Sequence, residues 1–423
     1  MDAIRSANQV NLEKSQPSHK LGLAFGSVPR EMWLLALALS LYAAFSQPTP
    51  DNIDWPEIAI GVLLVAIIGP INFLHGVFGI LNFQPRNSLS YGVASCCITA
   101  LFWIGLIGGI GYQNSPDDFI RDVIPFLYFS IPVMLRFSSS DLDGDVLRSL
   151  LSHLLGVTGI VYSVRHFLSA GANVGDIGES FMNSENLYFS TDPTVLFSVC
   201  FFFIMALRVA KRGSLGSTLL LVAYICASLV PLAALMLKGH RGPLGLAAIL
   251  FTFCVGLGIK KAPISSSLVI VIVGVAVYLS IDKLTGLFDL LVAKTDAVGI
   301  NERDVEFYSV IDTLGISSWK MLFGAGWGSE FLNPAAGGGY VNFAHFALSF
   351  FLLKAGAVGA FAFVVYCCCI IFWFWQQGKK DLRFALACSA PIIIGLAVNG
   401  SFRYLPFGLI VALLVREPWS AKG

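Results

Sequence analysis

Long apolar runs recur along this chain, and they constrain its fold more than any other feature. Several of them reach the roughly 17 to 25 residues that a helix needs to cross a bilayer. Hydrophobic residues make up 56% of the chain and charged residues 13%, which is far too apolar for a water-soluble globule. The runs are continuous, whereas a membrane β-barrel would show alternating segments of about ten residues. The sequence therefore predicts an all-α polytopic membrane protein.

The length of the runs predicts about twelve transmembrane helices. The predicted spans are 31–47, 57–82, 91–112, 119–136, 148–169, 194–209, 215–236, 243–259, 264–281, 341–376, 384–399 and 402–415. The predicted organisation is an N-terminal arm (1–30), spans one to nine (31–281), a long polar loop with an amphipathic helix (282–340), spans ten to twelve (341–415) and a short tail (416–423).

Basic residues gather in the N-terminal arm and in alternate connections. The basic groups after the sixth, eighth and tenth spans are Arg208, Lys211 and Arg212, then Lys260 and Lys261, then Lys379, Lys380 and Arg383. The positive-inside rule places this side, with both termini, in the cytoplasm. A long polar arm precedes the first apolar run, so we expect no cleavable signal and a first span that stays in the membrane.

The chain lacks the usual sequence signatures of bound cofactors. Its nine cysteines all fall within apolar spans, their number is odd, and no C-x-x-C occurs. This pattern favours small buried hydrophobic side chains over disulfides or metal ligands. No P-loop, H-E-x-x-H or G-x-S-x-G motif occurs either. We therefore expect no metal and no other cofactor.

The polar loop contains the sequence "NERDVEFYSVIDTL", which predicts a short amphipathic helix. Phe307, Val310, Ile311 and Leu314 recur at helical spacing. Arg303 lies four residues before Phe307, so it shares the apolar face, which we expect to pack on the membrane domain. The spacing leaves two interpretations open: a guanidinium aimed inward, or an interfacial arginine that reaches lipid headgroups.

Two further features follow in the same region. Gly324, Gly326 and Gly328 alternate in "LFGAGWGSEF", which is typical of a tight turn or of a close approach of backbone to a ligand. His345 stands at the outer edge of the tenth predicted span. A histidine at a helix start acts either as a structural hydrogen-bonding group or, where other polar groups converge on it, as a base.

The stretch "LMLKGHRGPLGLAAIL" places charges between two apolar runs. Lys238 and Arg241 lie on the outer side, which the positive-inside rule disfavours. Pro243 is suited to the first turn of a helix, so Arg241 falls at a helix N-terminus, where backbone N–H groups attract anions. An arginine fork also suits phosphate oxygens. The predicted topology brings Arg303 and His345 to this same face, which indicates a phosphate-headed lipid at the outer leaflet as the ligand.

Three segments together resemble a known family. In order along the chain they are "KGHRGPLGLAAIL", "RDVEFYSVIDTLGISSWKMLFGAGWGSEF" and "AHFALSFFLLKAGAVGAF". They are similar to the bacterial O-antigen ligase and O-antigen polymerase superfamily, and the resemblance covers about residues 215 to 376. Members are inner-membrane glycosyltransferases of about twelve spans that act on undecaprenyl-diphosphate-linked glycans at the periplasmic face. His240 stands where the family usually has Ser, and Phe346 where it usually has Asn.

The resemblance implies roles for individual residues. Arg241 and Arg303 would hold the diphosphate of the donor, and His345 would accept the proton of an acceptor hydroxyl, in a single inverting displacement without a metal. The expected substrate contacts are Lys238, His240, Gly324, Gly326 and Gly328. The expected partners are an undecaprenyl-diphosphate-linked glycan donor, a glycan or lipid acceptor and membrane lipid, with no nucleic acid.

Two questions stay open at the level of sequence. A polymerase and a ligase differ in their acceptor, and none of the residues named above indicates which acceptor sugar is bound. A transporter or flippase of lipid-linked oligosaccharide is the alternative class. A transporter is expected to show internal repeats, broken spans in both halves and polar sites at the membrane midplane. No repeat is apparent in the sequence, and the candidate charges lie at one edge, which favours the enzyme.

Overall fold

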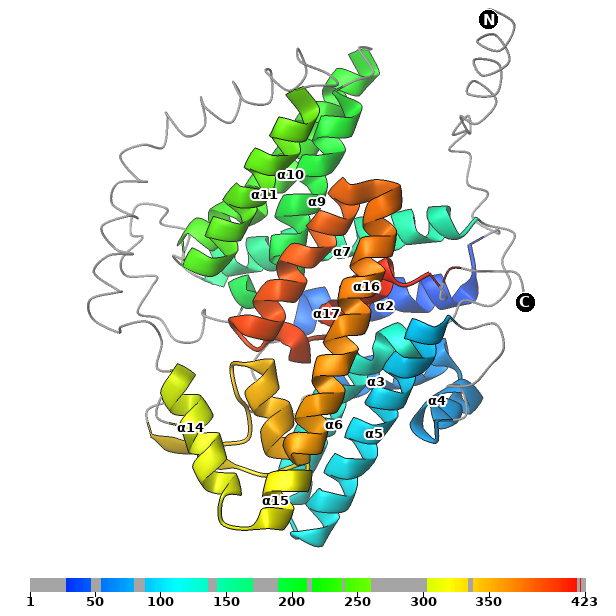
Figure 1. Ribbon diagram of the computed structural model, residues 1–423. Helices are drawn as coiled ribbons and strands as arrows, with labels where there is room; N and C mark the ends of the chain where they lie inside the picture. The colour runs from blue at the N-terminus through cyan, green and yellow to red at the C-terminus, as the bar shows by residue number, and fades with distance from the viewer. Residues whose placement is uncertain are drawn as a thin grey trace, which may run out of the picture.

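The elements of this chain are almost all helices, as the computed structural model shows (Figure 1). The structure describes residues 28–46, 55–79, 88–135, 143–169, 189–210, 215–237, 240–259, 303–333, 338–416 and Trp419. Four of the described helices are long and apolar enough to cross a membrane: Leu89–Gly111, Gly144–Ser169, Gly216–Leu237 and Ala347–Ala397. The fold is therefore helical and of a membrane type, as predicted. The predicted ninth span, 264–281, lies outside the described residues.

Helices in the first 259 residues follow the predicted apolar runs. They are α2 (Arg30–Phe45), α3 (Trp55–Ile68), α4 (Pro70–Val77), α5 (Leu89–Gly111), α6 (Pro116–Met134), α7 (Gly144–Ser169), the 3-10 turn η4 (Phe189–Thr191), α9 (Pro193–Val209), α10 (Leu215–Leu237) and α11 (Arg241–Ile259). The prediction of one continuous span over 57–82 is wrong. Gly69, at φ 80°, separates α3 from α4, and Pro70 opens α4 because proline suits a first helical turn.

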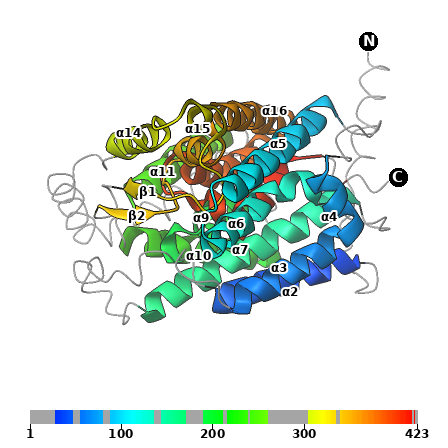
Figure 2. The same ribbon diagram turned by 90° about the horizontal axis from the view of Figure 1, so that it is seen from below.

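The described part of the polar segment before the last spans contains two short helices and a hairpin. The helices are α14 (Arg303–Leu314) and α15 (Ser318–Phe323). The strands β1 (Phe331–Asn333) and β2 (Gly339–Val341) pair antiparallel. Val310 and Leu314 of α14 are fully buried, so this helix packs one face against the protein. Figure 2 shows α14 and α15 along one side of the bundle, with α2 and α3 along the opposite side.

Helix α16 (Ala347–Ala397) is broken at two residues. Gly356 has φ 65° and ψ −162°, and Asp381 has φ −149° and ψ 86°, neither of which is helical. The predicted tenth span, 341–376, is therefore not one straight helix, because a residue with positive φ interrupts it. The first limb of α16, residues 347–355, lies on the N-terminal side of this break, and the limbs are drawn in orange to red-orange in Figure 1.

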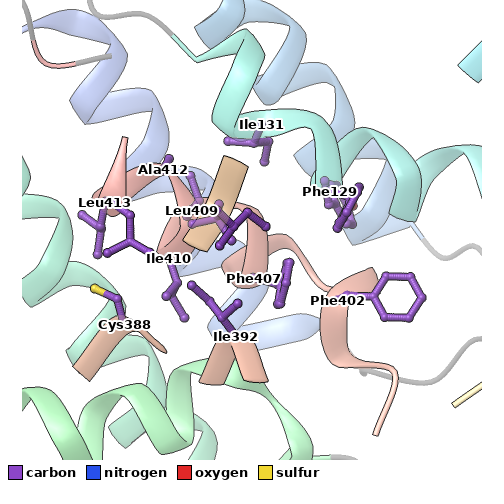
Figure 3. Packing of buried hydrophobic residues seen from close by; sticks show 14 of the residues in the cluster. Phe129, Ile131, Cys388, Ile392, Phe402, Phe407, Leu409, Ile410, Ala412 and Leu413 are labelled. Carbon is purple, nitrogen blue, oxygen red and sulfur yellow. The ribbon is translucent and has the colours of Figure 1, made fainter. Parts of the chain in front are cut away.

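The end of the chain supplies the centre of the core. The turn η6 (Ser401–Arg403) leads into α17 (Leu405–Leu414), and every residue of α17 is buried. Figure 3 shows Phe407, Leu409 and Ile410 of this segment among side chains of α6 and α16, including Phe129 and Ile392. Only ten residues of the predicted span 402–415 are in this helix, and protein surrounds them. The α17 helix is thus an interior element, and η6 beside it contacts both α6 and α16.

Candidate functional site

His345 lies just before α16 and is paired with a buried carboxylate. Its Nδ1 lies 2.7 Å from Oε2 of Glu306 on α14, and its backbone N–H donates to Oε1 of the same residue at 2.9 Å. The amide of Asn333, at the end of β1, donates to Oε2 at 3.2 Å. The Glu306 side chain is fully buried, whereas that of His345 is 36% exposed. The pair therefore has one partner inside the protein and one that a ligand can reach.

These contacts fix the charge and the proton positions of the pair. Burial alone raises the pKa of the Glu306 carboxyl, but the hydrogen bonds and charge of His345 together with the Asn333 amide outweigh it and hold the pKa below its ordinary value. Glu306 is therefore a carboxylate at neutral pH. An imidazole whose Nδ1–H donates to a carboxylate carries its lone pair on Nε2. The arrangement can therefore act as a general base, with Glu306 stabilising the imidazolium that forms.

Arg241 is the first residue of α11 and is exposed to solvent. This agrees with the helix start that the sequence indicated. The preceding His240 lies with Nε2 2.8 Å from the hydroxyl of Ser190 in η4, so it ties the start of α11 to that turn. The carbonyl of His240 accepts the Leu244 N–H at 3.0 Å and so begins the helix. Lys238 lies outside the described residues.

The turn that follows α16, residues 398–400, packs near both the start of α11 and His345. A methyl group placed on Gly242 would lie 3.4 Å from Val398 on this turn. A methyl group placed on Gly400 would lie 3.6 Å from the Cα of His345. The side-chain amide of Asn399 also donates to the carbonyl of Thr191, at 3.5 Å, next to the residue that contacts His240. The start of α11 and His345 thus both pack near residues 398–400.

Arg303 opens α14, three residues before Glu306. The face of α14 that is buried carries Glu306, Val310 and Leu314, spaced four residues apart. The side chain of Arg303 lies outside the described residues, so its predicted inward orientation stays a prediction. Its backbone position is nevertheless within one helical turn of the carboxylate that holds His345.

The three glycines of the glycine-rich turn all pack closely against other parts of the protein. Gly324, Gly326 and Gly328 have φ of 79°, 83° and 80°. A side chain at Gly326 would overlap the backbone of α5 at Gly108 and Gly109, and one at Gly328 would lie 2.8 Å from the Phe119 nitrogen. The structure therefore shows a packed turn, one of the two interpretations that the sequence left open, and the predicted substrate contacts of these glycines stay a prediction.

Backbone hydrogen bonds of the same turn are directed into the protein. The N–H groups of Ala325, Gly326 and Trp327 donate to carbonyls of Leu353, Lys354 and Gly105 at 2.8, 3.1 and 2.9 Å. The Asn114 amide donates to the carbonyls of Ala325 and Trp327, at 2.9 Å each. The turn thus clamps the first limb of α16 onto α5, and this limb is the one that His345 precedes.

A cluster of buried charges lies behind this turn, and the sequence motifs did not reveal it. Lys354 Nζ lies 2.5 Å from Asp122 Oδ2 and donates to the Ser329 carbonyl at 2.6 Å, and both side chains are fully buried. The Gly328 N–H donates to the same Asp122 oxygen at 2.7 Å. Arg403 of η6 approaches the other oxygen of Asp122 at 3.7 Å. The one signal in the sequence was that Lys354 and Arg403 are isolated charges in apolar stretches, where a charge is costly at membrane depth.

Within the described part of the chain, no group of three or more His, Cys, Asp or Glu residues is placed to hold a metal ion. All nine cysteines are free thiols. The described residues bring together a buried carboxylate and an imidazole, Glu306 and His345.

Comparison with known proteins adds no assignment, since no protein-family model and no curated protein matches the chain.

Proposed function

We propose that this protein is an inner-membrane glycosyltransferase that transfers or polymerises undecaprenyl-diphosphate-linked oligosaccharide units at the periplasmic face. The observation that carries the proposal is the Glu306–His345 pair, which packs near the same residues, 398–400, as the helix start that bears Arg241. The proposal includes about twelve spans, both termini in the cytoplasm and the segment 282–340 in the periplasm. The resemblance to the O-antigen ligase and polymerase superfamily supports the same reaction.

The proposed reaction is a single displacement at the anomeric carbon of the donor sugar. The acceptor hydroxyl oxygen forms the new glycosidic bond while the bond from the anomeric carbon to the diphosphate breaks, so the configuration inverts. His345 Nε2 takes the hydroxyl proton, and the Glu306 carboxylate stabilises the resulting imidazolium. The electron pair of the broken bond leaves with the diphosphate, whose charge Arg241 and Arg303 stabilise, so the proposed step is metal-independent.

The position of the polar groups favours an enzyme over a transporter of the same lipid. In the predicted topology His345 and Arg241 both lie at the outer edge of the membrane, and in the structure the helix start that bears Arg241 and His345 both pack near residues 398–400. A transporter is expected to hold its ligand at the midplane between two related halves. A site at the edge instead suits a lipid whose headgroup projects from the membrane and whose sugar meets an acceptor from outside.

His345→Ala and Arg241→Ala test the proposal. Each variant is expected to lose glycan transfer by at least about 10²-fold, because one removes the base and the other a cation at the leaving group. Transfer is measured with purified protein and an undecaprenyl-diphosphate-linked glycan. His153→Ala, a histidine of α7 bonded to the carbonyl of Ser149, is the matched control and is expected to keep full activity. Unchanged transfer by both site variants would overturn the assignment.

The choice between polymerase and ligase is a second question for the same site. A deletion strain that accumulates single-repeat products would identify a polymerase. A strain that accumulates long chains without an acceptor would identify a ligase.

A further inference from the structure

Arg403 carries a buried positive charge that the described residues do not balance. Its side chain is 9% exposed, and its neighbours Asp122 and Lys354 are fully buried. The cluster therefore holds two cations and one carboxylate. Lys354 already forms the short ion pair with Asp122, at 2.5 Å, whereas Arg403 reaches the same carboxylate only at 3.7 Å. A buried charge is stable only with a close partner, so the cluster has capacity for one anion.

The hydrogen-bonding capacity of Arg403 is also largely unused. Its Nη2 donates to the Arg121 carbonyl at 3.3 Å, and its guanidinium lies 5.4 Å from the centre of the Phe350 ring. A guanidinium has five N–H donors arranged as a planar fork. Within the described residues, Asp122 is the only carboxylate in ion-pair distance of Arg403.

Among the described residues, three buried polar atoms of Asp122 and of the segments that carry Arg403 and Phe350 have no hydrogen-bond partner. Oδ1 of Asp122, the oxygen that faces Arg403, has no hydrogen-bond partner. The hydroxyls of Ser401, two residues before Arg403, and Ser349, next to Phe350, are also buried without a partner. Buried polar atoms are normally satisfied by protein, water or a ligand. The two serine hydroxyls can each donate a hydrogen bond to a polar group from outside the chain, whereas the Asp122 oxygen can only accept one.

Arg403 lies close to the proposed site. Its guanidinium carbon is 6.0 Å from the centre of the Phe343 ring, and that ring is 5.6 Å from the ring of His345. It also follows directly on the turn that packs near both His345 and the start of α11. A diphosphate near His345 is therefore within reach of the fork of Arg403.

We propose that Arg403 binds a phosphate oxygen of a prenyl-linked diphosphate, from the buried side of the site. This inference rests on the proposed function and adds a residue to its donor site. The planar fork of arginine suits two phosphate oxygens at once. The Asp122–Lys354 pair would hold Arg403 in place without neutralising it, because the Asp122 charge is already paired with Lys354 at 2.5 Å and Arg403 lies 3.7 Å from the other oxygen.

Arg403→Gln separates ligand binding from structure. The substitution leaves Asp122 and Lys354 as a balanced pair, so the melting temperature of the ligand-free protein in nanodiscs is expected to be unchanged or higher. The affinity for undecaprenyl diphosphate, measured by its stabilisation of the protein, is expected to fall at least about tenfold, because charge-assisted hydrogen bonds are lost. Arg403→Lys, which keeps the charge and loses the fork, is expected to be intermediate.

Arg165→Gln is the matched control. Arg165 donates to the carbonyls of Ala43 and Ser46, at 2.7 and 2.9 Å, so its loss is expected to lower the melting temperature and leave the affinity unchanged. A ligand-free Arg403→Gln protein that fails to fold, or one that binds as the wild type does, would overturn the inference. If Arg403→Gln binds as the wild type does, the proposed glycan transfer by the wild type is not contradicted.

Two further binding experiments identify the ligand. Stabilisation by undecaprenyl diphosphate but not by phosphatidylglycerol supports a diphosphate site, and equal stabilisation by both contradicts it. Inorganic pyrophosphate is expected to compete with undecaprenyl diphosphate for the wild type. A wild type that binds neither diphosphate overturns this inference and the proposed donor together.

Discussion

Glu306 lies on the buried face of α14, four residues before Val310, and its carboxylate accepts three hydrogen bonds from His345 and Asn333. Without those donors a carboxylate so fully buried would be strongly destabilising. His345 was identified from its place at a predicted helix start, but its partner was not, because the two residues meet only through the packing of α14 beside α16. The one signal in the sequence was that Glu306, a charged residue, shares the helical spacing of the apolar residues Val310 and Leu314.

Glu306→Gln tests the role of this carboxylate. The amide no longer stabilises an imidazolium or fixes the proton on Nδ1, so the turnover number for glycan transfer is expected to fall by about 10² to 10⁴-fold. The Michaelis constant for the donor is expected to stay near the wild-type value, since Glu306 lies behind His345. Steady-state transfer kinetics measure both quantities, and a change confined to the Michaelis constant would contradict the base role.

The pH dependence of stability provides the control for that variant. The folded-state pKa of Glu306 is lowered, so its stabilising contribution is fully present above the ordinary glutamate pKa of about 4.3 and is lost as the pH falls below it. The melting temperatures of wild type and Glu306→Gln are therefore expected to differ most near neutral pH and to converge below that pKa. A difference that does not vary with pH would mean that the carboxylate charge contributes nothing.

At the scale of elements, the glycine-rich turn and the first limb of α16 act as one unit. Gly326 fits against α5 because Gly108 and Gly109 also lack side chains, and Trp327 fills the space beside Gly105. Trp327 is fully buried, and its Nε1–H donates to the Phe102 carbonyl at 3.1 Å. The sequence indicated a tight turn here, but not its docking site, because the matching glycines lie in a helix more than 200 residues earlier.

Gly326→Ala is expected to destabilise the protein more than Gly338→Ala. Both residues have positive φ, 83° and 77°, so each substitution incurs a backbone strain of order 1–3 kcal/mol. Only at Gly326 does the added methyl also overlap the backbone of α5, while at Gly338 it meets no atom within 4 Å. Thermal melting of the two variants in detergent compares them directly. Equal losses would show that the docking onto α5 contributes little.

At the scale of the whole molecule, the apolar runs predicted the helical membrane class and most helix positions. They did not predict the breaks at Gly69 and Gly356, because a hydropathy run has the same appearance whether the backbone continues or turns back. Nor did they predict that α17 is enclosed by protein, since lipid-facing and core-facing helices are equally apolar. The buried cluster of Asp122, Lys354 and Arg403 joins α6, α16 and η6, which lie far apart in the sequence, and therefore only the folded chain reveals it.

The most direct test of the central claim is the fate of the donor in a single compartment. Purified wild-type protein in detergent, given an undecaprenyl-diphosphate-linked glycan and an acceptor, is expected to release one undecaprenyl diphosphate for each new glycosidic bond, and His345→Ala is expected to release none. A donor that stays intact with the folded wild-type protein would contradict a glycosyltransferase and indicate a transporter.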